Sequence, residues 1–130
     1  MNPQYRPKPH YEEHFYENLN KYSVWLWFEN EQKKPVLQCD LYHNIKEIFI
    51  SDLHIGEEYE LEFYCRKGYY TEIMEFLLKF AHQNNYKIIT GELKSYDMCR
   101  RERQIHFYKK FGFVISEPDT HNNCNIRLEL

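Results

Sequence analysis

Two segments of the sequence predict its fold: CRKGYYTEIMEFLLKFAHQNNYKIITGEL at Cys65–Leu93 and RQIHFYKKFGF at Arg103–Phe113. Together they indicate a basic glycine turn, an amphipathic helix, a strand, and a second helix that ends at Gly112. A strand, helix and strand joined by short connections predict a right-handed parallel crossover. The first helix has one apolar face, formed by Ile73, Met74, Leu77, Phe80 and Ala81.

The glycine turn before the first helix indicates a binding site for phosphate. A helix start presents unpaired backbone N–H groups and the positive end of the helix dipole. Arg66 and Lys67 place two cations beside Gly68 at that start. We therefore expect the turn to hold a phosphate-bearing ligand, and an ordinary exposed charge pair is the alternative.

The remainder of the chain contains further strand patterns. Ser23–Phe28, Val36–Tyr42, Glu47–Ile55, Phe113–Ile115 and Asn125–Leu130 are predicted strands, the last of them antiparallel to its neighbour. Strict alternation along the third strand gives two faces. One face carries Phe49, Leu53 and Ile55, and the other carries Ile48, Ile50, Asp52 and His54.

Residues 1–21 are expected to be a lead-in that is partly irregular and partly helical. Prolines recur in the first nine residues and break regular structure there. Apolar side chains at Tyr11, Phe15 and Leu19 then recur every four residues. This spacing predicts a short helix over His10–Asn20.

Composition and charge exclude several classes of protein. The 130 residues suffice for a single domain, residues 1–130, with its own core. A net charge of −3 argues against nucleic acid as a partner, and short apolar runs argue against a membrane span. The four cysteines form no CxxC pair, so we expect reduced thiols and no metal site. Without an apolar signal segment, we expect a cytoplasmic protein.

The order of these parts resembles the GNAT family of N-acetyltransferases. The resemblance covers residues 45–115, and its more specific motif is HFYKKFGF at His106–Phe113. The turn RKGYYT is a weaker match, because Cys65 and Tyr70 stand where the family usually has Gln or Arg and a second glycine. The resemblance implies an α/β fold with a mixed, mostly antiparallel twisted sheet, splayed at the cofactor, and with helices on both faces.

The resemblance also implies acetyl-CoA as a cosubstrate, bound by residues 45–115 without a metal. Its pyrophosphate would lie on the turn and the helix start, at Arg66, Lys67, Gly68, Tyr69, Tyr70 and Thr71. Its pantetheine would pair with the strand edge at Leu53, His54 and Ile55. The activity implied is direct transfer of the acetyl group to the amine of a small molecule or peptide, by a monomer or homodimer.

Three residues have catalytic roles under this resemblance. Tyr108 matches the family tyrosine that protonates the departing thiolate, and a phenol is a suitable acid for that step. Asp52 or His54 could accept the proton that the attacking amine loses.

Less specific interpretations of these residues remain. Tyr108 has the spacing of a core residue, and Asp52 could be a solvated carboxylate. A non-catalytic CoA-binding or protein-interaction module with the same fold is the alternative function. A phosphate-binding protein of another family would explain the turn and leave HFYKKFGF without a role.

Overall fold

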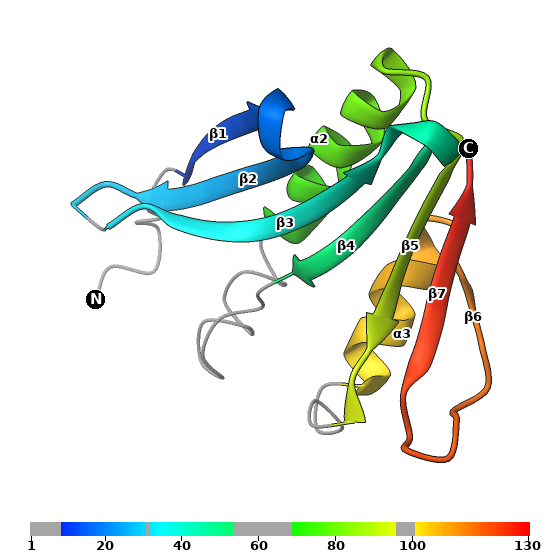
Figure 1. The fold of residues 1–130 in the computed structure, drawn as a ribbon. Coiled ribbons are helices and arrows are strands. Elements are labelled where there is room, and N and C mark those ends of the chain that lie inside the picture. The colour runs from blue at the N-terminus through cyan, green and yellow to red at the C-terminus, as the bar shows by residue number, and fades with distance from the viewer. Residues whose placement is uncertain (1–8, 31, 54–68, 96–100) are drawn as a thin grey trace, which may run out of the picture.

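The computed structural model describes residues 9–30, 32–53, 69–95 and 101–130, which form a seven-stranded sheet with two α-helices (Figure 1). The strand order is β1-β2-β3-β4-β5-β7-β6. The strands are β1 (Pro9–Tyr16), β2 (Lys21–Phe28), β3 (Lys34–Tyr42), β4 (Glu47–Leu53), β5 (Ile88–Leu93), β6 (Val114–Ile115) and β7 (Cys124–Glu129). The helices are α2 (Tyr69–Gln83) and α3 (Arg101–Lys110), with 3-10 turns η1 (Glu17–Leu19) and η2 (His43–Ile45).

Among the described strands, β4 and β5 pair in parallel and every other neighbouring pair is antiparallel. The predicted mixed, mostly antiparallel sheet is therefore confirmed. Helix α2 connects β4 to β5, and α3 connects β5 to β6 in the same direction, so right-handed crossovers place both helices on one face. Their contact agrees, since Tyr70 of α2 meets Phe107 of α3 edge-on with ring centroids 6.5 Å apart. The expectation of helices on both faces is wrong for the described residues.

The core lies between the sheet and these two helices. Tyr22 of β2 stacks on Phe80 of α2 with ring centroids 4.0 Å apart, and Phe28 meets Tyr69 edge-on at 5.2 Å. Burial of one large apolar side chain contributes about 1.5–3 kcal/mol. The predicted apolar face of α2 is buried throughout, at Ile73, Met74, Leu77, Phe80 and Ala81. Neither described helix has the length and hydropathy that a membrane span requires.

The first described element differs from its prediction. Pro9–Tyr16 is a strand, and only Glu17–Leu19 turns as a 3-10 helix, so the helix expected over His10–Asn20 is wrong. Tyr11 and Phe15 are four residues apart, a spacing that also places two side chains on one face of a strand. Pairing with β2 along the whole length of β1 selects the strand, and both rings pack on α2. The earlier part of the expected lead-in lies outside the described residues.

Strand β4 contains an extra residue at Ser51. Gln38 of β3 pairs with Asp52, whereas the next residue, Cys39, pairs with Ile50. Such a β-bulge breaks the alternation of side chains. Ile50 shares the core face with Cys39, and Asp52 shares the opposite face with Gln38, so the predicted alternation that joined Ile50 to Asp52 is wrong. The Ser51 hydroxyl donates to the Gln38 carbonyl at 2.9 Å and so supports the bulge.

The bulge lies where β4 and β5 separate. Their parallel register runs from Glu47 opposite Ile88 to Ile50 opposite Gly91. Beyond this point β4 continues with β3, and β5 continues with β7. A Cβ on Gly91 would lie 3.1 Å from Cδ1 of Ile126. Gly91 therefore allows a side chain of β7 to approach closely at the end of the shared register.

We predict that Gly91→Ala lowers the free energy of unfolding by about 1–3 kcal/mol, because the added methyl overpacks the core against Ile126. Urea unfolding followed by circular dichroism measures this change. Ile126→Val removes the methyl that clashes, so the cost of Gly91→Ala should be smaller in the Ile126→Val background. Equal costs in the two backgrounds would contradict the close packing.

Candidate functional site

A cleft of about 330 Å³ opens where β4 and β5 separate. Strand β4 contributes Phe49–Leu53, strand β5 contributes Glu92 and Leu93, and helix α3 contributes Gln104 and Tyr108. The β5-facing edge of β4 lies beside the cleft beyond Ile50, since its pairing with β5 has ended there. The cleft therefore combines a strand edge with side chains from both sides of the sheet.

Tyr108 and Asp52 approach this cleft from opposite faces of the sheet. Tyr108 comes from α3 on the helix side and is 4% exposed, whereas Asp52 lies on the other face and is exposed. Burial raises the pKa of Tyr108 well above its usual value, and Cys39 and Asp52 raise it further. The phenol is therefore protonated at neutral pH, and its O–H group is available to a ligand in the cleft. The Asp52 carboxylate is open to solvent.

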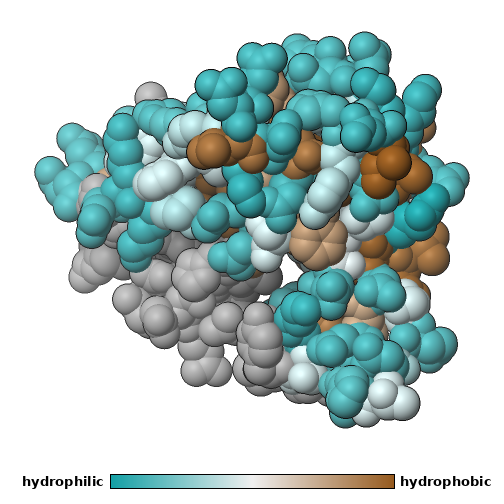
Figure 2. All heavy atoms as spheres, in the orientation of Figure 1, coloured by the Kyte–Doolittle hydropathy of each residue, from teal (hydrophilic) through white to brown (hydrophobic). Residues whose placement is uncertain are grey.

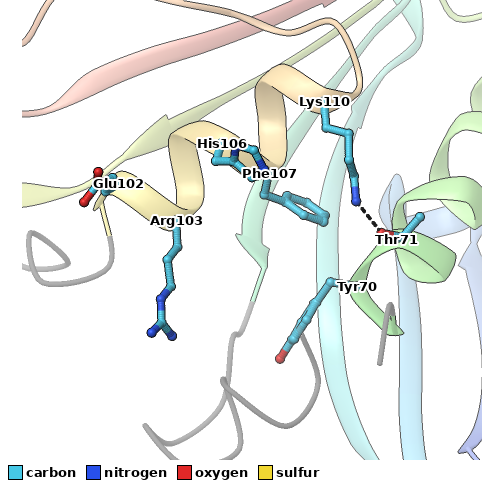
Figure 3. Close-up of a pocket in the computed structure, with 7 residues that line it drawn as sticks. All are labelled: Tyr70, Thr71, Glu102, Arg103, His106, Phe107 and Lys110. Carbon is cyan, nitrogen blue, oxygen red and sulfur yellow. Dashed lines mark hydrogen bonds between the residues drawn. The ribbon is translucent and has the colours of Figure 1, made fainter. Parts of the chain in front are cut away.

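A second hollow, of about 510 Å³, lies between the start of α2 and the exposed side of α3 (Figure 3). Helix α2 contributes Tyr70 and Thr71, and α3 contributes Glu102, Arg103, His106, Phe107 and Lys110. We call this hollow the interhelical groove. The Lys110 ammonium donates to the Thr71 hydroxyl at 2.8 Å and so bridges the two helices.

The interhelical groove suits an anionic group. Arg103, His106, Phe107 and Lys110 follow the spacing of one helix face, which places two permanent cations along one wall. Figure 3 shows the side chains of Arg103 and Tyr70 extending from the two helices toward the same opening. The start of α2 adds the positive end of a helix dipole to these charges.

Arg101 fixes the start of α3 at the end of the cleft. It is 8% exposed, and its guanidinium donates to the carbonyls of Lys94 at 3.2 Å and Asn122 at 2.7 Å. It also donates to the Leu93 carbonyl at 3.3 Å and contacts the Cys124 sulfur at 3.0 Å. These contacts join α3 to the end of β5 and to the connection before β7. The position of Tyr108, two turns along α3, depends on this attachment.

Comparison with known structures identifies this arrangement. An IAA acetyltransferase from Bacillus cereus superposes with a TM-score of 0.65 at 11% identity, over 95% of this chain and 100% of that one. A GNAT family acetyltransferase from Elizabethkingia anophelis with acetyl-CoA bound gives 0.63 at 11% identity, over 94% and 98% of the two chains. Ard1 from Thermoplasma volcanium gives 0.61 at 19% identity, over 83% and 70%. The chain has the GNAT fold.

The likeness to GNAT proteins lies in structure rather than in sequence. No family model matches the sequence. No curated protein matches it either. The GNAT fold therefore rests on the arrangement of strands and helices, which the solved structures share over most of the chain.

Some of the predicted site residues come together in the GNAT fold. Asp52, Leu53 and Tyr108 line the cleft, and Tyr70 and Thr71 line the interhelical groove. The ring of Tyr69, by contrast, packs in the core against Phe28 and is not part of the groove lining. The remaining predicted residues lie outside the described part of the chain: His54, Ile55, Arg66, Lys67 and Gly68.

Several residues of these two hollows were not predicted from the sequence. Arg103, His106 and Lys110 lie on the exposed side of α3, away from the apolar spacing that predicted this helix. Their own helical spacing could have revealed them. Gln104 and Arg101 carry no comparable signal, because their roles depend on where β5 and β7 end.

We predict that Arg101→Met lowers the free energy of unfolding by about 2–3 kcal/mol, since it removes charge-assisted hydrogen bonds and leaves buried carbonyls without donors. Urea unfolding provides the measurement. Arg103→Met, at an exposed position on the same helix, is the matched control and should change stability by less than about 0.5 kcal/mol. Similar effects of the two substitutions would show that Arg101 does not anchor α3.

Proposed function

We propose that this protein transfers an acetyl group from acetyl-CoA to an amine. The observation that carries the proposal is the cleft between β4 and β5, which a buried phenol and an exposed carboxylate line from opposite faces of the sheet. The GNAT fold supports the same conclusion, because its solved examples include acetyltransferases.

The two hollows suit the two parts of acetyl-CoA. Arg103 and Lys110 in the interhelical groove could bind its phosphates, with the start of α2 as a further positive group. The strand edge at Ser51–Leu53 could pair with the amide groups of its pantetheine arm. These two interactions together would bring the thioester to the cleft, beside Tyr108 and Asp52.

Two side chains then accept and donate the protons that the reaction transfers. As the amine nitrogen forms its bond to the acetyl carbon, Asp52 accepts, directly or through water, the proton that the nitrogen loses. As the bond between that carbon and sulfur breaks, Tyr108 supplies a proton to the sulfur. Their places on opposite faces of the sheet would allow the amine and the thiol to lie on opposite sides of the cleft.

A second candidate function is CoA binding without turnover. It is favoured by Tyr70, whose ring lines the groove at the position where the GNAT turn usually has a small residue. The ring could hold the nucleotide half of CoA in a way that slows its exchange. Turnover measurements with a panel of amines separate this candidate from the enzyme.

We predict that acetyl-CoA binds with micromolar affinity, on the order of −8 kcal/mol. Arg103→Ala and Lys110→Ala should each weaken binding by about 3–10-fold, more strongly at low salt than at high salt. Isothermal titration calorimetry measures both effects. Lys109→Ala is the matched control, because Lys109 is a neighbouring exposed cation that is not part of the groove lining. An equal loss in Lys109→Ala would mean that only net charge matters.

We predict that Tyr108→Phe lowers turnover by about two to four orders of magnitude, the contribution of a positioned acid, and that Asp52→Asn has a comparable effect. Thiol release in the presence of acetyl-CoA and a panel of amines is the assay. Tyr108→Phe should retain acetyl-CoA affinity, since the ring remains in place. Tyr86→Phe serves as control, because it removes another buried phenol that hydrogen-bonds His43 away from the cleft. Normal turnover in Tyr108→Phe would show that Tyr108 contributes only to packing.

A further inference from the structure

The sheet face opposite the helices carries a cluster of aromatic and charged side chains over β1 and β2. Strand alternation places His10, Glu12 and His14 on this face, together with Trp25 and Trp27. His10 is directly opposite Trp27 in the register, and Glu12 is directly opposite Trp25. No helix of the described residues covers this face, and Figure 2 shows it as largely hydrophilic, with paler side chains gathered over these strands.

The rings of this cluster are held in place by one another. His10 stacks on Trp27 with ring centroids 5.5 Å apart and an interplanar angle of 19°. His14 lies 5.5 Å from Trp25, whose indole N–H donates to the Ser23 hydroxyl at 3.1 Å. Both tryptophans are partly exposed. The cluster therefore presents fixed indole rings to solvent, and a fixed aromatic surface loses little entropy when a ligand binds.

One ammonium group already occupies the cluster. The Lys33 nitrogen lies 4.6 Å from the centroid of the Trp27 ring and 3.1 Å from Oε2 of Glu12. The other oxygen of Glu12 contacts Nε2 of His14 at 2.6 Å. Lys33, followed by His14, holds the pKa of Glu12 below its ordinary value, so the carboxylate is charged at neutral pH. An indole face and a carboxylate together are the groups that bind an alkylammonium ion.

Lys33 is held weakly enough to be replaced. Its side chain is 52% exposed. Exposed cation–π contacts and exposed ion pairs are both weak, because water screens the charges. An external ammonium group could make the same two contacts, and it would displace Lys33 when other contacts hold its molecule at the cluster.

The cluster and Asp52 of the cleft lie on the same face of the sheet. Ser23 pairs with Gln38, and Gln38 pairs with Asp52, so this row leads directly to the cleft. Trp25 lies two residues along β2 from that row and two strands from β4, which gives about 12 Å to Asp52. Glu12, one strand farther, lies at about 16 Å. An extended peptide covers these distances in about four or five residues.

We propose that Glu12, Trp25 and Trp27 form a subsite for a lysine side chain of a peptide acceptor, in the position that Lys33 occupies within the chain. The proposal rests on the proposed function and adds its substrate class. The acceptor is a peptide whose lysine lies about four or five residues from the amine that is acetylated.

Tryptophan emission tests the subsite directly, because Trp25 and Trp27 are the only two tryptophans of the chain. The probe is an alanine-rich peptide with a free N-terminus and lysine at position five, and its control has norleucine at that position. We expect the lysine peptide to change the emission in a saturable way and the norleucine peptide to leave it unchanged. Equal responses to the two peptides would overturn the proposal.

Three variants sharpen this test. Lys33→Met removes the competing ammonium and should strengthen lysine-peptide binding by about 3–10-fold, whereas Glu12→Gln should weaken it by a similar factor. Trp27→Leu keeps an apolar side chain without the indole face and should abolish discrimination between the peptides, read by calorimetry. Unchanged lysine-peptide affinity in Lys33→Met would overturn the assignment of Lys33 as an occupant of the subsite.

Acetyl-CoA titrations and peptide turnover separate this proposal from the proposed function. All three variants should bind acetyl-CoA normally, because the subsite and the interhelical groove lie on opposite faces of the sheet. In turnover assays, lysine at position five should lower KM relative to lysine at position two, with kcat unchanged. Peptide discrimination without any acetyl-CoA binding would refute the proposed function and the acceptor role, and would leave a lysine-binding surface. Acetyl-CoA binding without discrimination would refute the subsite alone.

Discussion

The extra residue at Ser51 is the constraint on which the site depends. It keeps β4 paired with β3 while turning its other edge away from β5, and the shared register of β4 and β5 ends at Ile50 and Gly91. A continuous sheet would fill this space with backbone hydrogen bonds and leave no opening for a ligand. The same residue moves Asp52 to the face opposite the core. One inserted residue thus creates the cleft and provides its carboxylate.

The two faces of the sheet have different roles. On one face α2 and α3 bury the core, form the interhelical groove and bring Tyr108 to the cleft. On the other face β1 and β2 are joined by the short turn Glu17–Leu19, and no described helix lies over them. An acceptor that approaches this face would therefore contact side chains of the strands directly. Trp25 and Trp27 are two of the side chains that it would contact.

Much of the fold follows from local pattern in the sequence. The apolar face of α2 has a period that only a helix satisfies, and the glycine that ends α3 has a positive φ of 93° at Gly112. The sequence pattern of β1 fits both a helix and a strand, because side chains four residues apart share a face in either structure. Pairing with β2, a contact between distant residues, selected the strand.

The site was predicted less completely than the fold, for a physical reason. Tyr108 was predicted from the resemblance of HFYKKFGF to the GNAT family, and Asp52 because a carboxylate on the predicted strand could accept a proton; both line the cleft. The bulge at Ser51 was not predicted. The adjacent polar residues Ser51 and Asp52 interrupt the apolar pattern of Glu47–Ile55, but such a break does not by itself fix how the strand pairs. Bulges are properties of two paired strands, so a single strand sequence does not reveal them. The spacing of Arg103 and Lys110 along α3 is visible in the sequence. These two cations lie on the side of the helix opposite its predicted apolar face.

The short shared register of β4 and β5 has a mechanical consequence. Strands β1–β4 form one antiparallel unit and β5–β7 form another. In the described part of the chain, the pairing of β4 with β5 joins the two units through four residue pairs. Twisting one unit against the other would widen or narrow the cleft while every antiparallel hydrogen bond stays intact. Helix α2 connects the two units and would serve as the axis of this twist. The opening between β4 and β5 is thus also the place where the two antiparallel units can turn relative to each other.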